Sequence, residues 1–136
     1  MAHEPAQRSR RKVRPHERLN AWQKGIVLVG EVYRLTTSFP VEERYGLVSQ
    51  IRRAACSVPA NLAEGAARGT DREFSHFLSL ARGSLSELET HFFIAHHLGF
   101  VKESDLDLLL ELTGTVDRLI NGLKSKRTSI SESPVV

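Results

Sequence analysis

The sequence predicts an all-α protein with the architecture of an antiparallel up-down four-helix bundle. Apolar residues recur at intervals of three and four in four successive segments, which is the period of an amphipathic helix. No segment shows the alternation of apolar and polar residues that is typical of a half-buried strand. Pro40, Gly69 and Gly99 separate the segments, so short connections are expected. The 136 residues suit a single domain with one core.

The first helix is expected over residues 18–38. Its apolar positions follow the helical period, and Phe39-Pro40 disfavours a continuation because the residue before a proline avoids the helical conformation. These apolar positions are Leu19, Trp22, Ile26, Val29 and Tyr33, with Val32 as a further candidate.

The second helix is expected over residues 41–68 and has three chemically different faces. The apolar face contains Leu47, Ile51, Ala54, Val58 and Leu62, the polar face Gln50, Arg53, Ser57, Asn61 and Glu64, and the small face Ser49, Cys56, Ala60, Ala63 and Ala67. A helix that packs on its own core needs only the first face, so the small face predicts a second close helix from this chain or another. Pro59 is expected to kink or divide the helix because proline lacks the N–H donor and clashes with the preceding turn.

The third and fourth helices have recognisable starts. Thr70 followed by Glu73 is a capping-box pattern, which predicts a helix over residues 71–98. Ser104 is the expected N-cap of the last helix, and the bundle is expected to span residues 19–124. Residues 125–136 have no helical pattern, and fraying is expected there.

The basic charge is concentrated at the N-terminus. The whole chain has a net charge of +3, yet residues 1–18 contain six basic and two acidic side chains. The rest of the chain is therefore close to neutral. Prolines and low apolar content predict that residues 1–18 form a disordered basic arm. The arm is interpreted either as a phosphate-attracting segment or as a solubilising extension.

The residue types and their spacing also indicate where the protein is located and whether it is an enzyme. No apolar run approaches the length that spans a bilayer, and no secretion signal is visible, so a cytoplasmic location is expected. Ser57, Ser84, Glu87 and His91 are catalytic residue types, but their spacing assembles no site. Glu73-x-x-His76 occurs as a single copy, whereas a di-iron bundle needs two. No enzyme activity, metal or cofactor is expected.

The motifs resemble a known family over about residues 19–123. The residues that carry the resemblance are Leu19 with Trp22-Gln23-Lys24, Phe39-Pro40 with Glu43, Gln50-Ile51-Arg52-Arg53-Ala54, Ser57-Val58-Pro59-Ala60-Asn61, Glu64-Gly65, Phe77-Leu78, Ala81 with Gly83-Ser84-Leu85, and Glu87-Leu88-Glu89. They resemble the 23S rRNA intervening-sequence proteins, a family similar to the accessory proteins of diversity-generating retroelements. The resemblance implies a homopentameric ring of four-helix protomers and an interaction protein that binds nucleic acid or a protein partner such as a polymerase.

Binding residues are predicted around the second and third helices. The candidate nucleic-acid contacts are Arg52, Arg68, Arg72 and Arg82. In an oligomer these side chains repeat and form a multivalent cationic surface. The expected helix seam or subunit interface contains Gln50, Arg53, Ser57, Ala60, Asn61, Ala63 and Glu64, in which Arg53, Asn61 and Glu64 pair within the fold or across subunits. The two functions left open are an oligomeric nucleic-acid-binding accessory protein and an oligomeric scaffold for a protein partner.

Overall fold

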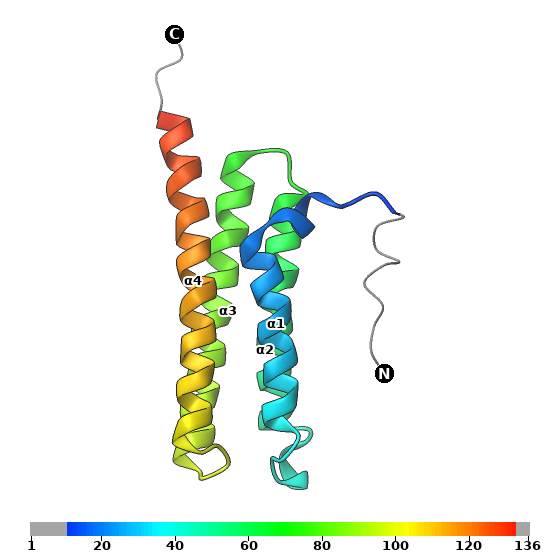
Figure 1. Cartoon of the computed structure of the whole chain (residues 1–136), viewed down its shortest axis with the longest axis vertical. Helices are drawn as coiled ribbons and strands as arrows, with labels where there is room; N and C mark the ends of the chain where they lie inside the picture. The colour runs from blue at the N-terminus through cyan, green and yellow to red at the C-terminus, as the bar shows by residue number, and fades with distance from the viewer. Residues whose placement is uncertain (1–10, 133–136) are drawn as a thin grey trace.

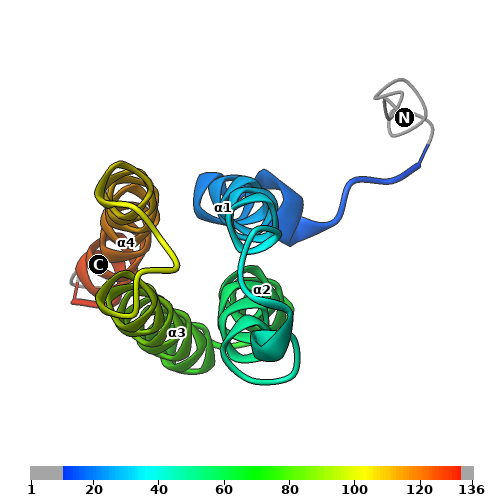
Figure 2. The same cartoon turned by 90° about the horizontal axis from the view of Figure 1, so that it is seen from below.

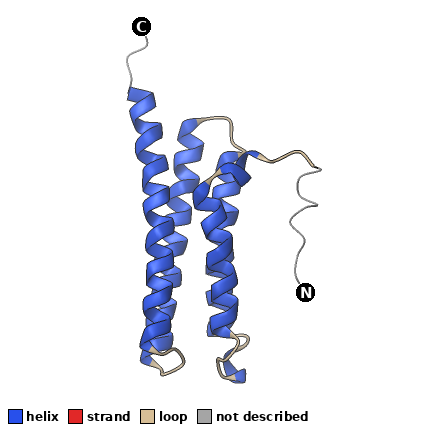
Figure 3. Ribbon diagram, viewed as in Figure 1, coloured by secondary structure: helices blue, strands red, loops and turns tan. Residues whose placement is uncertain are grey.

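The computed structural model describes residues 11–132, with side-chain surroundings up to residue 125. Four long helices form most of it: α1 (Asn20–Thr36), α2 (Leu47–Ala66), α3 (Asp71–His97) and α4 (Glu103–Glu132). Two short 3-10 helices, η2 (Pro15–Arg18) and η3 (Val41–Glu43), precede α1 and α2. Figure 3 shows that the described residues contain no strand. The predicted all-α class and the four helices are confirmed.

The helices pack side by side in the order of the chain. Successive helices run in opposite directions along the long axis of the molecule (Figure 1). Seen end on, the helices occupy four corners, with α2 between α1 and α3, and α4 on the diagonal from α2 (Figure 2). The outer surface that α1 and α2 form together therefore faces away from α4.

One hydrophobic core fills the space between the four helices. Its largest fully buried side chains are Leu28 and Val32 of α1, Ile51, Val58 and Leu62 of α2, Leu78, Leu88 and Phe92 of α3, and Leu109, Val116 and Ile120 of α4. Removal of this apolar surface from water is the main stabilising contribution to such a bundle. The predicted apolar face of α2 is confirmed, with Leu47 half-buried and its other four residues buried.

The predicted core face of α1 is partly wrong. Ile26 and Tyr33 follow the helical period, yet they remain 46% and 42% exposed. Val32 is buried as expected, together with Leu28 and Leu35, which were not predicted. The period of a sequence gives the spacing of a stripe, but two neighbouring stripes on α1 are apolar, and only the position of the other helices decides which one enters the core.

The second helix begins later than predicted and is not divided at Pro59. Residues 41–43 form η3, and α2 begins after Gly46, whose backbone is far from helical at φ −106° and ψ −107°. α2 then continues through Pro59, which is buried. A Cβ added at Gly25 of α1 would lie 3.5 Å from the Pro59 Cβ, so the proline ring packs closely on α1. A kink at Pro59 stays a prediction.

The third helix begins as predicted, with half of the capping box formed. The backbone N–H of Glu73 donates to Thr70 Oγ1 at 3.2 Å. The Thr70 hydroxyl donates to the Glu73 carboxylate, also at 3.2 Å, in place of the expected bond from the backbone N–H of Thr70. This cap satisfies one of the free amide groups at the start of α3.

The fourth helix differs from the prediction at its start and reaches further at its end. Ser104 is not the N-cap, because α4 already includes Glu103 and the N–H groups of Asp105 and Leu106 both donate to Lys102 O at 3.1 Å. At the other end, α4 continues to Glu132. No helix in the described part of the chain is long and apolar enough to cross a membrane.

Part of the predicted N-terminal arm is ordered onto α1, and residues 1–10 lie outside the described residues. Arg11 forms an ion pair with Glu17 at 2.7 Å. The Gln23 side chain donates to Glu17 O at 2.7 Å, and the His16 ring lies 5.1 Å from the Trp22 ring. These contacts attach η2 to the first turn of α1.

Candidate nucleic-acid interface

The four predicted arginines do not form one cluster. Arg52 lies near the start of α2, beside the end of α1, whereas Arg68 and Arg72 flank the connection between α2 and α3. Sixteen helical residues rise about 24 Å, which separates Arg52 from Arg68 along the axis of α2. Arg82 lies on α3 and faces α4. A single chain therefore presents these charges at three separate places.

Two of these charges are paired within the protomer. Arg68 forms an ion pair with Glu64 at 2.9 Å and lies over the Phe77 ring at 5.0 Å. Arg82 forms an ion pair with Asp117 of α4 at 2.9 Å. Such exposed pairs stabilise a protein by only about 0–1 kcal/mol. Their main effect here is that each carboxylate reduces the positive potential around its arginine. Arg72 is exposed and forms no ion pair with any described residue.

Arg52 is held in position by neutral groups. Its Nε donates to Thr36 Oγ1 at 2.9 Å, and a second guanidinium nitrogen donates to Tyr33 O at 3.4 Å. The guanidinium carbon lies 4.4 Å from the centre of the Tyr33 ring, a cation–π contact. None of these partners carries negative charge, so the cation is oriented but not neutralised.

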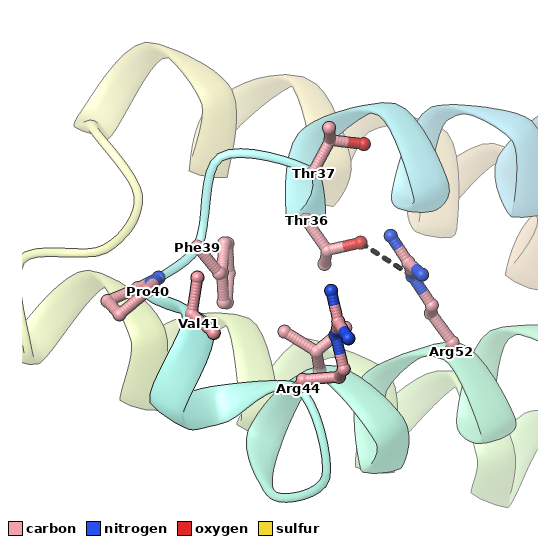
Figure 4. Close-up of a pocket in the computed structure, with 8 residues that line it drawn as sticks. Thr36, Thr37, Phe39, Pro40, Val41, Arg44 and Arg52 are labelled. Carbon is pink, nitrogen blue, oxygen red and sulfur yellow. Dashed lines mark hydrogen bonds between the residues drawn. The ribbon is translucent and has the colours of Figure 1, made fainter.

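Arg52 and Arg44 line two adjoining pockets, which we call together the arginine groove. The inner pocket has a volume of about 240 Å³ and the outer pocket about 410 Å³, and they share Arg44, Val48 and Arg52. The inner pocket is completed by Thr36, Thr37, Phe39, Pro40 and Val41, and the outer pocket by Tyr33, Tyr45, Ser49, Arg53 and Cys56. Figure 4 shows the side chains of Arg44 and Arg52 next to each other beside Thr36.

The arginine groove is cationic. Arg44, Arg52 and Arg53 line it, and among the residues that the structure describes no aspartate or glutamate does. Among the described residues, neither Arg44 nor Arg53 forms an ion pair. The nearby Glu43 accepts a hydrogen bond from the backbone N–H of Leu47 at 3.3 Å. Three uncompensated guanidinium groups in one concave surface attract an anion.

The Tyr33 phenol at the groove is protonated at physiological pH. The Tyr33 hydroxyl and Cys56 Sγ are 4.0 Å apart. The pKa of Tyr33 is raised, chiefly by electrostatic interaction with Cys56 and then by the hydrogen bond between them. A raised pKa keeps the phenol protonated, so Tyr33 adds no negative charge to the groove.

Sequence reasoning missed Arg44, Tyr33 and Tyr45 as site residues. Tyr33 was assigned to the core, and Arg44 was placed inside a helix that in fact begins at Leu47. The connection over residues 37–46 brings Arg44 back beside Arg52, eight positions later in the chain. The available signal was the adjacent pair Arg44-Tyr45, because arginine and tyrosine are both enriched at binding surfaces.

The predicted seam residues lie on the outer side of α2. Gln50, Arg53, Ala60 and Glu64 are exposed, and Ser57, Asn61 and Ala63 are half-buried.

The hydrogen bonds and ion pairs of these residues join positions three or four apart in the chain. Ser57 Oγ donates to Ala54 O at 2.7 Å, and Asn61 Nδ2 donates to Ser57 O at 2.8 Å. Glu64 pairs with Arg68, so the expected pairing of Arg53 with Glu64 does not form inside the protomer. Pairing across a subunit seam stays a prediction.

The candidate catalytic types remain dispersed. His91 Nε2 lies 3.4 Å from the Glu87 carboxylate, a contact between neighbouring turns of α3. Within the described residues, no group of three or more histidine, cysteine, aspartate or glutamate side chains is placed to hold a metal ion.

Comparison with known proteins identifies the family. The sequence pattern of the 23S rRNA-intervening sequence proteins matches residues 17–122, which include the end of η2, all of α1 to α3 and most of α4. A comparison with curated proteins finds no match. Because the family pattern extends over most of the chain and coincides with the four-helix bundle, this protein belongs to the 23S rRNA-intervening sequence protein family.

Proposed function

We propose that this protein is a non-enzymatic, oligomeric RNA-binding accessory protein of the cytoplasm, and that the arginine groove contacts the RNA. Family membership indicates an RNA-associated role. The observation that carries the proposal is the pair Arg44 and Arg52, which line a pocket to which no carboxylate of the described part of the chain contributes. Arginine binds phosphate through its planar set of N–H donors, and this geometry suits a nucleic-acid backbone.

Oligomerisation strengthens this proposal physically. The chain outside residues 1–18 is close to neutral, so one protomer attracts RNA only weakly. A ring repeats the arginine groove once per subunit, and several weak contacts on one RNA act at a high effective concentration. The homopentamer implied by the family resemblance is the assembly that we propose.

Exposed apolar side chains favour a second candidate function. Leu80, Phe93 and Ile94 of α3 are all exposed in the protomer. Exposed apolar groups of this size are typical of protein contact surfaces. The alternative is therefore an oligomeric scaffold for a protein partner such as a polymerase, without direct contact to nucleic acid.

The salt dependence of binding separates the two functions. We expect the protein to bind a structured RNA with an affinity that falls about tenfold or more between ~50 and ~200 mM salt, because each phosphate contact releases counterions. Fluorescence anisotropy with labelled RNA measures this dependence. An apolar contact to a protein partner changes little over the same range.

The N-terminal arm needs its own control. A chain that begins at Arg11 keeps η2 and its contact with α1 while it lacks Arg8 and Arg10. Equal RNA affinity for the two chains shows that residues 1–10 do not carry the binding. Binding by the full chain alone assigns it to residues 1–10, and the absence of binding by both leaves the scaffold function.

The small face of α2 tests the proposed assembly. Ala60 is exposed in the protomer, so Ala60→Leu is expected to leave the fold of each subunit intact. If the small face is packed against another subunit, the larger side chain overfills the contact at a cost of about 1–3 kcal/mol and reduces the mass of the assembly. Light scattering at micromolar concentration measures that mass. An unchanged mass would contradict burial of this face, and a monomeric parent protein would contradict the ring itself.

A further inference from the structure

The inner pocket of the arginine groove is formed before any ligand binds. Its wall residues Phe39 and Val48 are buried, and the Phe39 ring packs against Phe100 with ring centres 5.7 Å apart. The backbone N–H of Phe39 donates to Thr36 O at 3.1 Å, which closes the turn after α1. Thr36 donates in turn to Val32 O at 2.8 Å. A pocket held in this way needs little ordering on binding, which favours affinity.

Arg44 is placed at the rim of the pocket by η3. The backbone N–H of Arg44 donates to Val41 O at 3.1 Å, and that of Glu43 donates to Pro40 O at 2.9 Å. This 3-10 turn places Arg44 at the same pocket as Arg52 and Thr36 (Figure 4). The two cations repel each other unless an anion lies between them.

The chemistry of the pocket combines apolar walls with a cationic rim. Phe39, Pro40, Val41 and Val48 provide the walls, and the Thr36 and Thr37 side chains also line the pocket. Its volume of about 240 Å³ is below the range of drug-sized sites, which suits one small planar group. A nucleobase with the phosphates on either side of it has this combination of an apolar face and flanking negative charge.

The outer pocket adds two aromatic side chains. Tyr45 is 88% exposed and Tyr33 is 42% exposed, and both line the outer pocket beside Arg53. Exposed tyrosine rings next to arginines are the elements with which proteins stack successive bases of a single strand. A regular duplex keeps its bases stacked inside, so it offers no base face to these rings.

We infer that the arginine groove binds an unpaired segment of RNA, with one base in the inner pocket, the next base against Tyr45, and their phosphates on Arg44 and Arg52. This inference rests on the proposed RNA-binding function and deepens it, because it names single-stranded RNA as the ligand. The groove then discriminates between a loop, bulge or free end and a continuous duplex.

The test compares one RNA strand in its unpaired and paired forms. The full-length protein is titrated into a fluorescently labelled single strand of about 12 nucleotides, and into the same strand in a blunt duplex, at equal salt. Tyr45→Ala is expected to weaken binding of the single strand about 5- to 100-fold and to leave duplex binding almost unchanged. Tyr45→Phe keeps the aromatic face, so it is expected to restore binding to within about twofold of the parent protein.

Charge variants separate the groove from general attraction. Arg44→Gln removes a positive charge at the groove, and Arg118→Gln removes the same charge from the exposed face of α4. We expect the first variant to weaken binding of the single strand more than the second. Thermal melting and mass measurements check that each variant remains folded and assembled.

The outcomes distinguish the inference from the function on which it rests. Equal affinity for single strand and duplex, or full affinity in Tyr45→Ala, overturns the inference while RNA binding itself stands. Equal loss in Arg44→Gln and Arg118→Gln also overturns it, because general charge attraction then explains the binding. If the parent protein binds neither RNA, the proposed function is wrong as well.

Discussion

Phe92→Ala is expected to destabilise the protein by about 3–5 kcal/mol, the largest loss that we predict for a single substitution. Phe92 is fully buried in the core. The substitution removes most of an aromatic side chain and leaves a cavity that the four packed helices cannot close. Chemical denaturation followed by circular dichroism measures the free energy of unfolding.

The adjacent Phe93 is a matched control for Phe92. It has the same side chain in the same helix, but it is 51% exposed. We expect Phe93→Ala to change the free energy of unfolding by only about 0.5 kcal/mol, as is usual for surface positions. Equal losses at the two positions would show that the assignment of the core face of α3 is wrong.

Gly65→Ala is expected to destabilise the protein although alanine is the better helix former. A Cβ added at Gly65 would lie 2.8 Å from Phe77 Cβ and 3.5 Å from Phe74 O. The atom that it meets is attached directly to the backbone of α3, so relief requires that the two helices move apart. Such overpacking costs about 1–3 kcal/mol, which exceeds the gain of about 1 kcal/mol in helix propensity.

Gly83 provides the opposite expectation for the same substitution. It also lies inside a helix, but a Cβ added there meets no atom within 4 Å. Gly83→Ala is therefore expected to raise the melting temperature, because only the propensity gain of about 1 kcal/mol remains. If Gly65→Ala were stabilising too, the close approach of α2 and α3 at this point would be contradicted. A loss of stability at Gly83 would indicate that another subunit packs there.

The helices could be predicted because their signals are local. The period of apolar residues, the Thr70 cap and the glycine after α2 depend only on neighbouring positions in the chain. The same signals failed where two local choices have similar energy. Ser104 is a good capping residue, yet α4 begins at Glu103. A 3-10 turn replaces the first predicted turns of α2, because the chain must first cross the end of the bundle.

The candidate site could be predicted only in part. Arg52 was recognised from the family motif, whereas Arg44 and Tyr45 belong to a connection without a periodic pattern. Their approach to Tyr33 depends on the path of residues 37–46. Arg68 and Arg82 were predicted to contact nucleic acid, but in the fold they form ion pairs with Glu64 and Asp117.

The sequence by itself determined that this protein is a bundle of four helices, where most of those helices lie, and to which family it belongs. Those properties follow from local backbone preference and from the spacing of apolar residues. Only the tertiary structure decided which face of α1 is buried, which arginines are neutralised, and that Arg44, Arg52 and two tyrosines share one groove. The physical reason is that ion pairs and pockets form between helices. The distance of the residues that form them along the chain does not indicate their distance in space.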